Sequence, residues 1–150
     1  DSDTFPTKPQ NLIVDGKMRF GREKGIKLAD FYLDHMKRMW PGYNFAKETD
    51  QSGINHHMMI DKETLREMRE TLSPDRIFWE KVIDKLSPEH YLGSGCSEFE
   101  MYYFYMLKKY PERMYICDID RREVETLQQV EEATDDGFVD QVSWHSWKRK

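Results

Sequence analysis

Two short acidic motifs contain the residues with the clearest potential for chemistry, and the first is Asp1-Ser2-Asp3 at the start of the chain. In an extended segment side chains alternate with a period of two, so both carboxylates can face one divalent cation. Mg²⁺ and Mn²⁺ take oxygen ligands and can neutralise the charge that builds on a departing nucleoside diphosphate. Taken alone, the motif is explained better as a solvated acidic terminus, because Asp-x-Asp is common by chance.

The second acidic motif is Ser97-Glu98-Phe99-Glu100, at the start of a predicted helix. Ser97-x-x-Glu100 matches a capping box, which accounts for Glu100 structurally. Glu98 has no capping duty and can point into a cleft, where a carboxylate can remove the proton of an acceptor hydroxyl. We predict Glu98 as the main catalytic residue and Glu100 as the second candidate. Gly95, just before the motif, would let the backbone approach a sugar, although loop flexibility explains a glycine equally well.

Composition indicates a folded, soluble protein. The 150 residues suit one domain, and eight Tyr, eight Phe and four Trp are too many aromatics for a disordered chain. The net charge of -5 argues against a broad phosphate-binding surface, so nucleic acid is not a predicted partner. No apolar run is long enough to span a bilayer. Cys96 and Cys117 lack metal-ligand spacing and read as free thiols, which favours a reducing compartment and predicts a cytoplasmic location.

Hydrophobic periodicity and capping signals predict an α/β fold in which helices flank a short mixed sheet. A hairpin is predicted around Asp15-Gly16, between strands at 11–14 and 17–20. The further predicted strands are 54–60, 113–119 and 138–144. The predicted helices are 28–40, 62–72 after an N-cap at Asp61, a third that begins at Ser73-Pro74, a fourth from Ser97 to Pro111, and 120–133.

Four short motifs follow one another along nearly the whole chain: Asp1-Ser2-Asp3, His56-His57-Met58, Ser97-Glu98-Phe99-Glu100 and Trp144-His145. In this order they resemble the GT-A-fold glycosyltransferases, and most closely a poorly characterised group among them. The resemblance implies the C-terminal portion of a GT-A fold, the fold of nucleotide-diphospho-sugar transferases. Residues 1–150 would then be a single domain, a fragment that starts at the Asp-x-Asp motif and lacks the upstream nucleotide-binding half.

The resemblance also implies a function, namely sugar transfer from a nucleotide-sugar donor to the hydroxyl of a glycan or other acceptor. The reaction would be inverting, with a glutamate as general base, and would need Mn²⁺ or Mg²⁺. Asp3 would be the main metal ligand, Asp1 would contact the metal through water or hold the ribose, and His145 would complete the coordination. The implied substrate-binding residues are Asp1, Ser2, His56, His57, Gly95 and Ser97.

The two adjacent histidines are expected to have different roles. In a strand, the side chains of His56 and His57 point to opposite faces, so the pair does not easily ligate one metal. A strand histidine most often makes a structural hydrogen bond. We therefore expect one of the two to be structural and the other to bind substrate.

Two other functions remain open. In a metal-dependent phosphotransfer domain, Asp1 would be the nucleophile and Asp3 the acid-base group, with Asp135-Asp136 as a faint candidate for the further acidic pair. In a non-catalytic interaction module, the aromatic helix of residues 99–110 would form part of a partner-binding surface.

Overall fold

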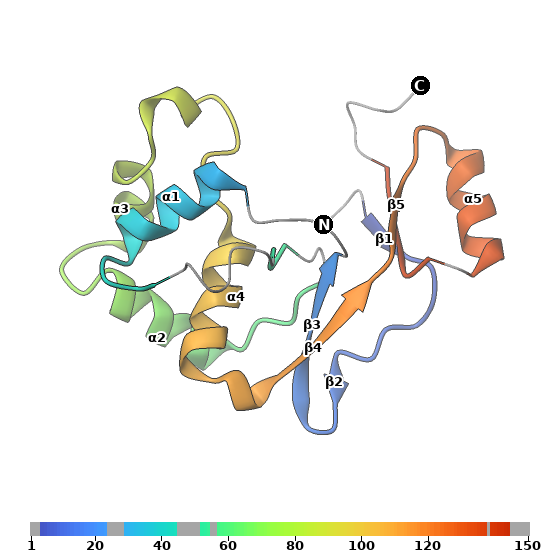
Figure 1. Ribbon diagram of the computed structural model, residues 1–150, viewed down its shortest axis with the longest axis horizontal. Helices are drawn as coiled ribbons and strands as arrows, with labels where there is room; N and C mark the ends of the chain where they lie inside the picture. Colours follow the sequence, from blue (N-terminus) through green and yellow to red (C-terminus); the bar gives the residue numbers. More distant parts are fainter. Residues whose placement is uncertain (1–3, 24–28, 45–51, 55–56, 138, 145–150) are drawn as a thin grey trace.

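Two small mixed sheets form the framework of the protein, which we describe from a computed structural model (Figure 1). The structure describes residues 4–23, 29–44, 52–54, 57–137 and 139–144. The first sheet has the order β2-β3-β4, with bounds Ile13–Val14, Lys17–Glu23 and Met114–Ile119. The second has the order β1-β6-β5, with bounds Thr4–Pro6, Gln141–Ser143 and Arg121–Glu123. In each sheet the central strand has one antiparallel and one parallel neighbour.

The predicted hairpin is confirmed. Strands β2 and β3 are joined by Asp15 and Gly16, whose φ angles of 49° and 74° are both in the left-handed region. Two successive positive φ angles define the turn whose twist matches the twist of a two-residue hairpin, and Asp-Gly is a favoured pair for it. The edge position of β1, which ends at Pro6, follows from the same kind of rule, because proline cannot donate a ladder hydrogen bond.

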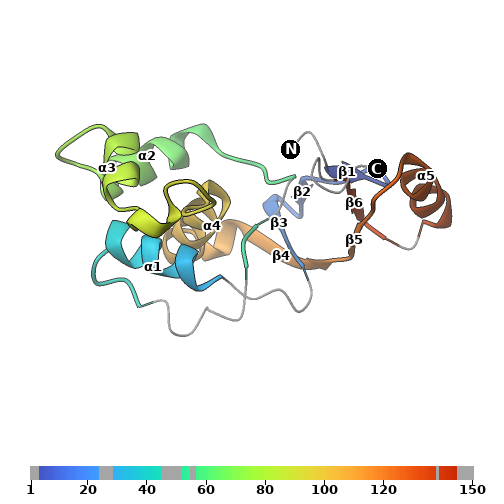
Figure 2. The same ribbon diagram turned by 90° about the horizontal axis from the view of Figure 1, so that it is seen from above.

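Four helices lie together on one side of the β2-β3-β4 sheet, and the fifth lies at the opposite end of the molecule beside the other sheet (Figures 1 and 2). The four are α1 (Asp30–Met39), α2 (Lys62–Leu72), α3 (Phe78–Asp84) and α4 (Glu98–Lys109), and the fifth is α5 (Leu127–Asp136). Two short 3-10 turns, η2 (Pro88–His90) and η3 (Pro111–Arg113), connect them. The mixed α/β class predicted from sequence is therefore observed. None of the described helices is long and apolar enough to cross a membrane.

Helix α4 is the centre of the larger core. Its residues 101–106 are all buried, where an amphipathic helix would bury only one face. The Phe20 ring on β3 packs against Tyr102 at a centroid distance of 6.3 Å and against Tyr103 at 5.9 Å. Apolar residues from α1, α2 and the sheet complete this core: Met18, Met36, Met39, Met68, Leu72 and Met114.

A second, smaller core lies beneath α5. Val124, Ala133, Val139 and Val142 are buried there, and Ala133 and Val142 are completely inaccessible. The segment that enters this core differs from the sequence prediction, because residues 120–133 do not form one helix. Strand β5 pairs with β6 first, and α5 begins only after Thr126, whose hydroxyl accepts a hydrogen bond from the Gln129 amide. Strand pairing with β6 thus displaces the start of the helix.

The third helix also begins later than predicted. Its N-cap is Ile77 rather than Ser73, because the Ser73 hydroxyl donates to the Arg76 carbonyl at 2.8 Å and closes a turn ahead of the helix. Phe78 and Val82 pack against the larger core, whereas Ile83 on α3 is exposed. By contrast, α2 starts at its predicted cap, where the Asp61 carboxylate accepts from the Thr64 amide at 2.8 Å.

A fully buried histidine joins α1 to α3. The His35 Nε2 lies 3.0 Å from the Val82 carbonyl, which can only accept, so Nε2 carries the proton. Its Nδ1 has no hydrogen-bond partner among the described residues. Burial lowers the pKa of His35 below its usual 6.5, and the charge of Arg38 lowers it further, while the bond to Val82 opposes the shift.

We expect His35 to make folding stability sensitive to mild acid. Since its folded pKa is depressed, the unfolded chain binds the proton more tightly, so stability is full above pH 6.5 and falls as pH drops below that value. His35→Gln keeps a donor for Val82 without titrating. Thermal unfolding between pH 8 and pH 5 should show wild type losing stability relative to His35→Gln as pH falls. A constant difference over this range would contradict the assignment.

Candidate functional site

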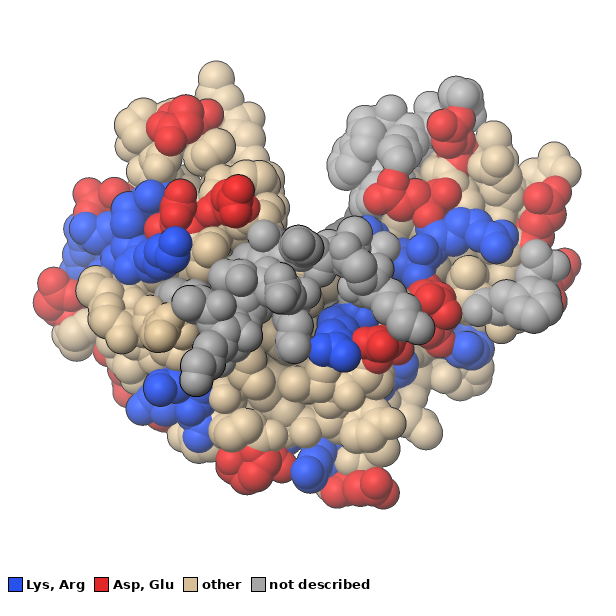
Figure 3. Space-filling view, in the orientation of Figure 1, with Lys and Arg blue, Asp and Glu red and all other residues tan. Residues whose placement is uncertain are grey.

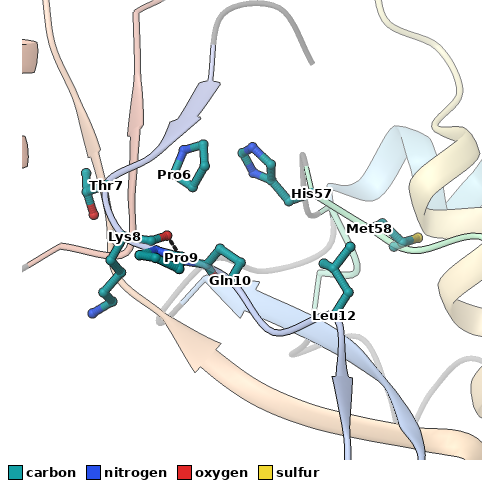
Figure 4. Close-up of a pocket in the computed structure, with 8 residues that line it drawn as sticks. All are labelled: Pro6, Thr7, Lys8, Pro9, Gln10, Leu12, His57 and Met58. Carbon is teal, nitrogen blue, oxygen red and sulfur yellow. Dashed lines mark hydrogen bonds between the residues drawn. The ribbon is translucent and has the colours of Figure 1, made fainter.

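A hollow of about 540 Å³ lies between the loop that follows β1 and the segment that carries His57 (Figure 4). We call it the His57 hollow, and its lining residues are Pro6, Thr7, Lys8, Pro9, Gln10, Leu12, His57 and Met58. Pro6 and the His57 ring lie at one end, and Leu12 and Met58 lie at the other. The hollow thus joins the segment directly after the acidic opening to the His-His-Met motif, some 50 residues further along the chain.

The polar side chains of the loop bind other parts of the protein. The Thr7 hydroxyl donates to the Val139 carbonyl. The Lys8 ammonium lies 2.8 Å from an Asp140 carboxylate oxygen, and in Figure 4 the Lys8 side chain extends away from His57 and Leu12. Gln10 accepts from the Arg19 guanidinium. The loop therefore offers the His57 hollow mainly hydrocarbon.

A second, more polar hollow shares Pro9 with the first. Its volume is about 320 Å³. Its lining residues are Pro9, Asn11, Val14, Arg19, Tyr115, Cys117, Asp118 and Asp140. Two of these, Arg19 and Asp140, are the residues that hold Gln10 and Lys8. The charged groups around the loop thus gather at the second hollow rather than at the His57 hollow.

The segment of His57 is clamped to helix α4 at both ends. Before His57, the Ser52 hydroxyl donates to Glu100 Oε1 at 2.6 Å and the Gly53 amide donates to Glu100 Oε2 at 2.7 Å. After it, the Asp61 amide donates to the Tyr102 hydroxyl at 2.9 Å. Two neighbouring turns of one buried helix therefore hold both ends of the segment that lines the hollow.

These clamps replace the strand that the sequence predicts at 54–60. The described residues of that stretch, 54 and 57–60, contain no strand. The amides that a neighbouring strand would pair are bonded to α4 side chains at Gly53 and Asp61. Gly53 also lies so close to α4 that an added Cβ would be 2.3 Å from the Tyr103 Cβ. The strand prediction is therefore wrong in the described residues, because buried polar groups on a helix satisfy the backbone.

Glu100 is a buried carboxyl with a positioning role. Its side chain is completely inaccessible, and burial raises its pKa above the ordinary value, while the hydrogen bonds from Ser52 and Gly53 oppose that shift. Only half of the predicted capping box forms. The Ser97 hydroxyl accepts from the Glu100 amide at 3.2 Å, but the Glu100 carboxylate turns to residues 52 and 53 instead of reaching back.

The remaining predicted residues around the start of α4 have different surroundings. Glu98 is exposed on the first turn, and within the described chain it forms no hydrogen bond or ion pair. Ser97 is buried as the N-cap. Gly95 is buried too, and a side chain there would come within 2.8 Å of Leu86 and His90. The structure therefore gives Ser97 and Gly95 local structural contacts, and their substrate contacts stay predictions.

Five predicted site residues lie outside the described residues: Asp1, Ser2, Asp3, His56 and His145. The metal site assigned to Asp1, Asp3 and His145 thus stays a prediction. Within the part of the chain that the structure describes, no three His, Cys, Asp or Glu side chains are grouped to hold a metal. Cys96 and Cys117 are both free and half-buried, as predicted, and the Arg19 guanidinium donates to the Cys117 sulfur at 3.1 Å.

The sequence did not indicate Ser52, Gly53 and Tyr102 as parts of this site. The partners of each clamp are 41 to 48 residues apart, so no local pattern links them. One usable signal was Glu100 itself, because a carboxylate inside an otherwise apolar helix of Met, Tyr and Phe residues needs a buried partner. Ser-Gly before a chain segment with few charges was a candidate partner, since a serine hydroxyl and an unhindered glycine amide can both donate.

On the face shown in Figure 3, Lys and Arg side chains are interspersed with Asp and Glu. Ion pairs of opposite sign account for part of this pattern, such as Arg22 with Asp118 and Arg76 with Asp84. Comparison of the chain with protein-family models, curated proteins and solved structures gives no match.

Proposed function

We propose that the protein is a metal-dependent glycosyltransferase that moves a sugar from a nucleotide-sugar donor to an acceptor hydroxyl. The observation that carries the proposal is the His57 hollow, because it brings the loop after Asp1-Ser2-Asp3 together with the His-His-Met motif. Only Thr4 and Phe5 separate Asp3 from Pro6 on the wall of the hollow. Three residues of chain span at most about 11 Å, so a metal bound by the acidic motif would be close to this wall.

The size of the hollow and its neighbours suit this reaction. Small-molecule sites occupy roughly 300 to 1,000 Å³, a range that includes the His57 hollow. Mn²⁺ or Mg²⁺ on Asp1 and Asp3 would hold the diphosphate and neutralise it as the bond to the sugar breaks. His57 would contact the substrate, and Glu98 would accept the proton of the acceptor hydroxyl.

The alternative functions have less support. An interaction module built on the aromatic helix would need that helix to be exposed, whereas residues 101–106 of α4 are all buried. A phosphotransfer domain would need a further acidic pair facing the first. Its candidate, Asp135 and Asp136, lies on the last turn of α5, which packs over the smaller core.

Nucleotide binding provides the test. Titration of UDP and of GDP into the protein, together with any natural sequence that precedes residue 1, should show binding that requires Mn²⁺. Asp3→Ala removes the main predicted metal ligand, and we expect it to weaken metal-dependent binding at least about 100-fold, the scale of losing a tight charge contact worth about 3 kcal/mol.

Asp75→Ala is the matched control, because Asp75 is an exposed aspartate on the turn before α3, away from the residues that line the His57 hollow. It should bind as wild type does. Binding of neither nucleotide, with or without Mn²⁺, or equal binding by Asp3→Ala and wild type, would overturn the proposed function.

A further inference from the structure

The chemistry of the His57 hollow points to a particular kind of ligand. Four of its lining residues, Pro6, Pro9, Leu12 and Met58, have no side-chain hydrogen-bonding group apart from the weakly accepting thioether of Met58. Leu12 is 41% exposed although its neighbours leave room for it to pack more deeply into the molecule's apolar parts. Exposed hydrocarbon that lines a concave surface is typical of sites that bury an apolar group.

The polar lining residues do not change this preference. Thr7 donates its hydroxyl hydrogen to Val139, Lys8 is paired with Asp140, and the Gln10 amide oxygen accepts from Arg19. A ligand rich in hydroxyls or phosphate would have to break these bonds to gain its own, and each such exchange gives little net free energy. A hydrocarbon group loses nothing by leaving them intact.

We propose that the His57 hollow binds the alkyl group of an amphiphilic acceptor, so that the acceptor hydroxyl stays at the rim near the acidic motif. This inference rests on the proposed function for the word acceptor, whereas the preference for an alkyl group rests on the lining alone. The donor diphosphate, which needs cations and donors, would bind outside the hollow.

The clamps on α4 give the hollow a fixed wall. Glu100 and Tyr102 hold the two ends of the segment that carries His57 and Met58, and Met58 itself packs against the larger core. The opposite wall is the proline-containing loop, whose ring-restricted backbone has little freedom to lose. A preformed apolar site costs less ordering on binding than a mobile one.

The test compares n-hexyl β-D-glucoside with methyl β-D-glucoside. Binding is followed by the NMR signals of the Met58 and Leu12 methyl groups, below the concentration at which the hexyl glucoside forms micelles. Each buried methylene contributes about 0.8 kcal/mol, or about fourfold in Kd, so burial of three of the five additional carbons predicts binding about 60-fold tighter for the hexyl compound.

Two leucine variants locate the effect. Leu12→Asn places an amide in the lining at a part-exposed position, and we expect it to remove at least about tenfold of the hexyl preference, as loss of a side-chain apolar contact of about 1.4 kcal/mol would. Leu92→Asn makes the same change at a fully exposed leucine outside the hollow, and it should keep the preference. Unfolding temperatures of both variants check that they are folded.

Equal Kd values for the two glucosides, or a hexyl preference that Leu12→Asn leaves intact, would overturn the inference. Its failure is separate from failure of the proposed function. Transfer from a nucleotide sugar with Mn²⁺ but without an alkyl preference would retain the function and reject the alkyl site. Conversely, alkyl binding that Leu12→Asn weakens, in a protein that binds no nucleotide, would retain the alkyl site and reject the glycosyltransferase.

Discussion

Glu100→Ala is expected to lower the free energy of unfolding by about 2 to 4 kcal/mol, because it leaves two buried donors without an acceptor at about 1 to 3 kcal/mol each. The donors are the Ser52 hydroxyl and the Gly53 amide, both in buried residues. The expected loss is smaller than the sum of the two, since the substitution also removes a carboxyl that is costly to ionise in this position. Urea unfolding at pH 7 measures it.

Glu100→Gln is the matched comparison. Its amide oxygen can accept from the Gly53 amide, and its NH2 group can donate to the Ser52 hydroxyl oxygen, so we expect a loss below about 1 kcal/mol. The two variants separate lost hydrogen bonds from lost charge. If Glu100→Ala were as stable as Glu100→Gln, the clamp on residues 52 and 53 would contribute nothing to stability.

The same pair predicts a pH dependence. Burial raises the folded pKa of Glu100 above its ordinary 4.5, so its contribution to stability is complete below pH 4.5 and is lost as pH rises through the folded pKa. Glu100→Gln cannot show this loss. The stability of wild type relative to Glu100→Gln should therefore decrease from pH 4.5 towards neutral, opposite in direction to the effect expected from His35.

Glu98→Gln is expected to reduce sugar transfer by about 10²- to 10⁴-fold, the usual contribution of a general base, while metal-dependent binding of the donor stays unchanged. Glu98 is exposed on the first turn of α4 and supports no contact among the described residues, so its removal should leave the fold intact. Loss of its favourable interaction with the helix N-terminus costs at most about 1 kcal/mol.

The assay measures transfer with Mn²⁺ and a nucleotide-sugar donor, alongside donor binding by calorimetry. Glu131→Gln, which changes an exposed glutamate on α5, is the control and should transfer as wild type does. Wild-type turnover in Glu98→Gln would remove Glu98 from the mechanism. A parallel fall in donor binding and transfer would assign it a binding role instead.

The local elements of this fold could be predicted from the sequence because their signals lie within a few residues of each other. Asp15-Gly16 determines a hairpin through the φ angles that its turn requires. Asp61 and Ser97 each satisfy an amide three residues on, and this interaction sets the starts of α2 and α4. The α/β class follows from such elements in order.

Predictions failed where a distant partner decided the conformation. Residues 121–123 pair with β6 instead of joining the helix that their own sequence favours. The stretch at 54–60 looks like a strand by its apolar residues, yet its ends are held by side chains of α4. In both cases long-range hydrogen bonds override a local preference that is worth less than about 1 kcal/mol per residue.

For the candidate site, the sequence by itself determined which residues have the chemistry: two acidic motifs, a histidine pair and their order along the chain. Only the tertiary structure decided that Glu100 is buried against Ser52 and Gly53 while Glu98 is exposed, although both stand on the same helical turn. Only the structure formed the His57 hollow from two distant segments. The physical reason is that burial and hollow shape depend on which segments pack together, and residue type and spacing do not contain that information.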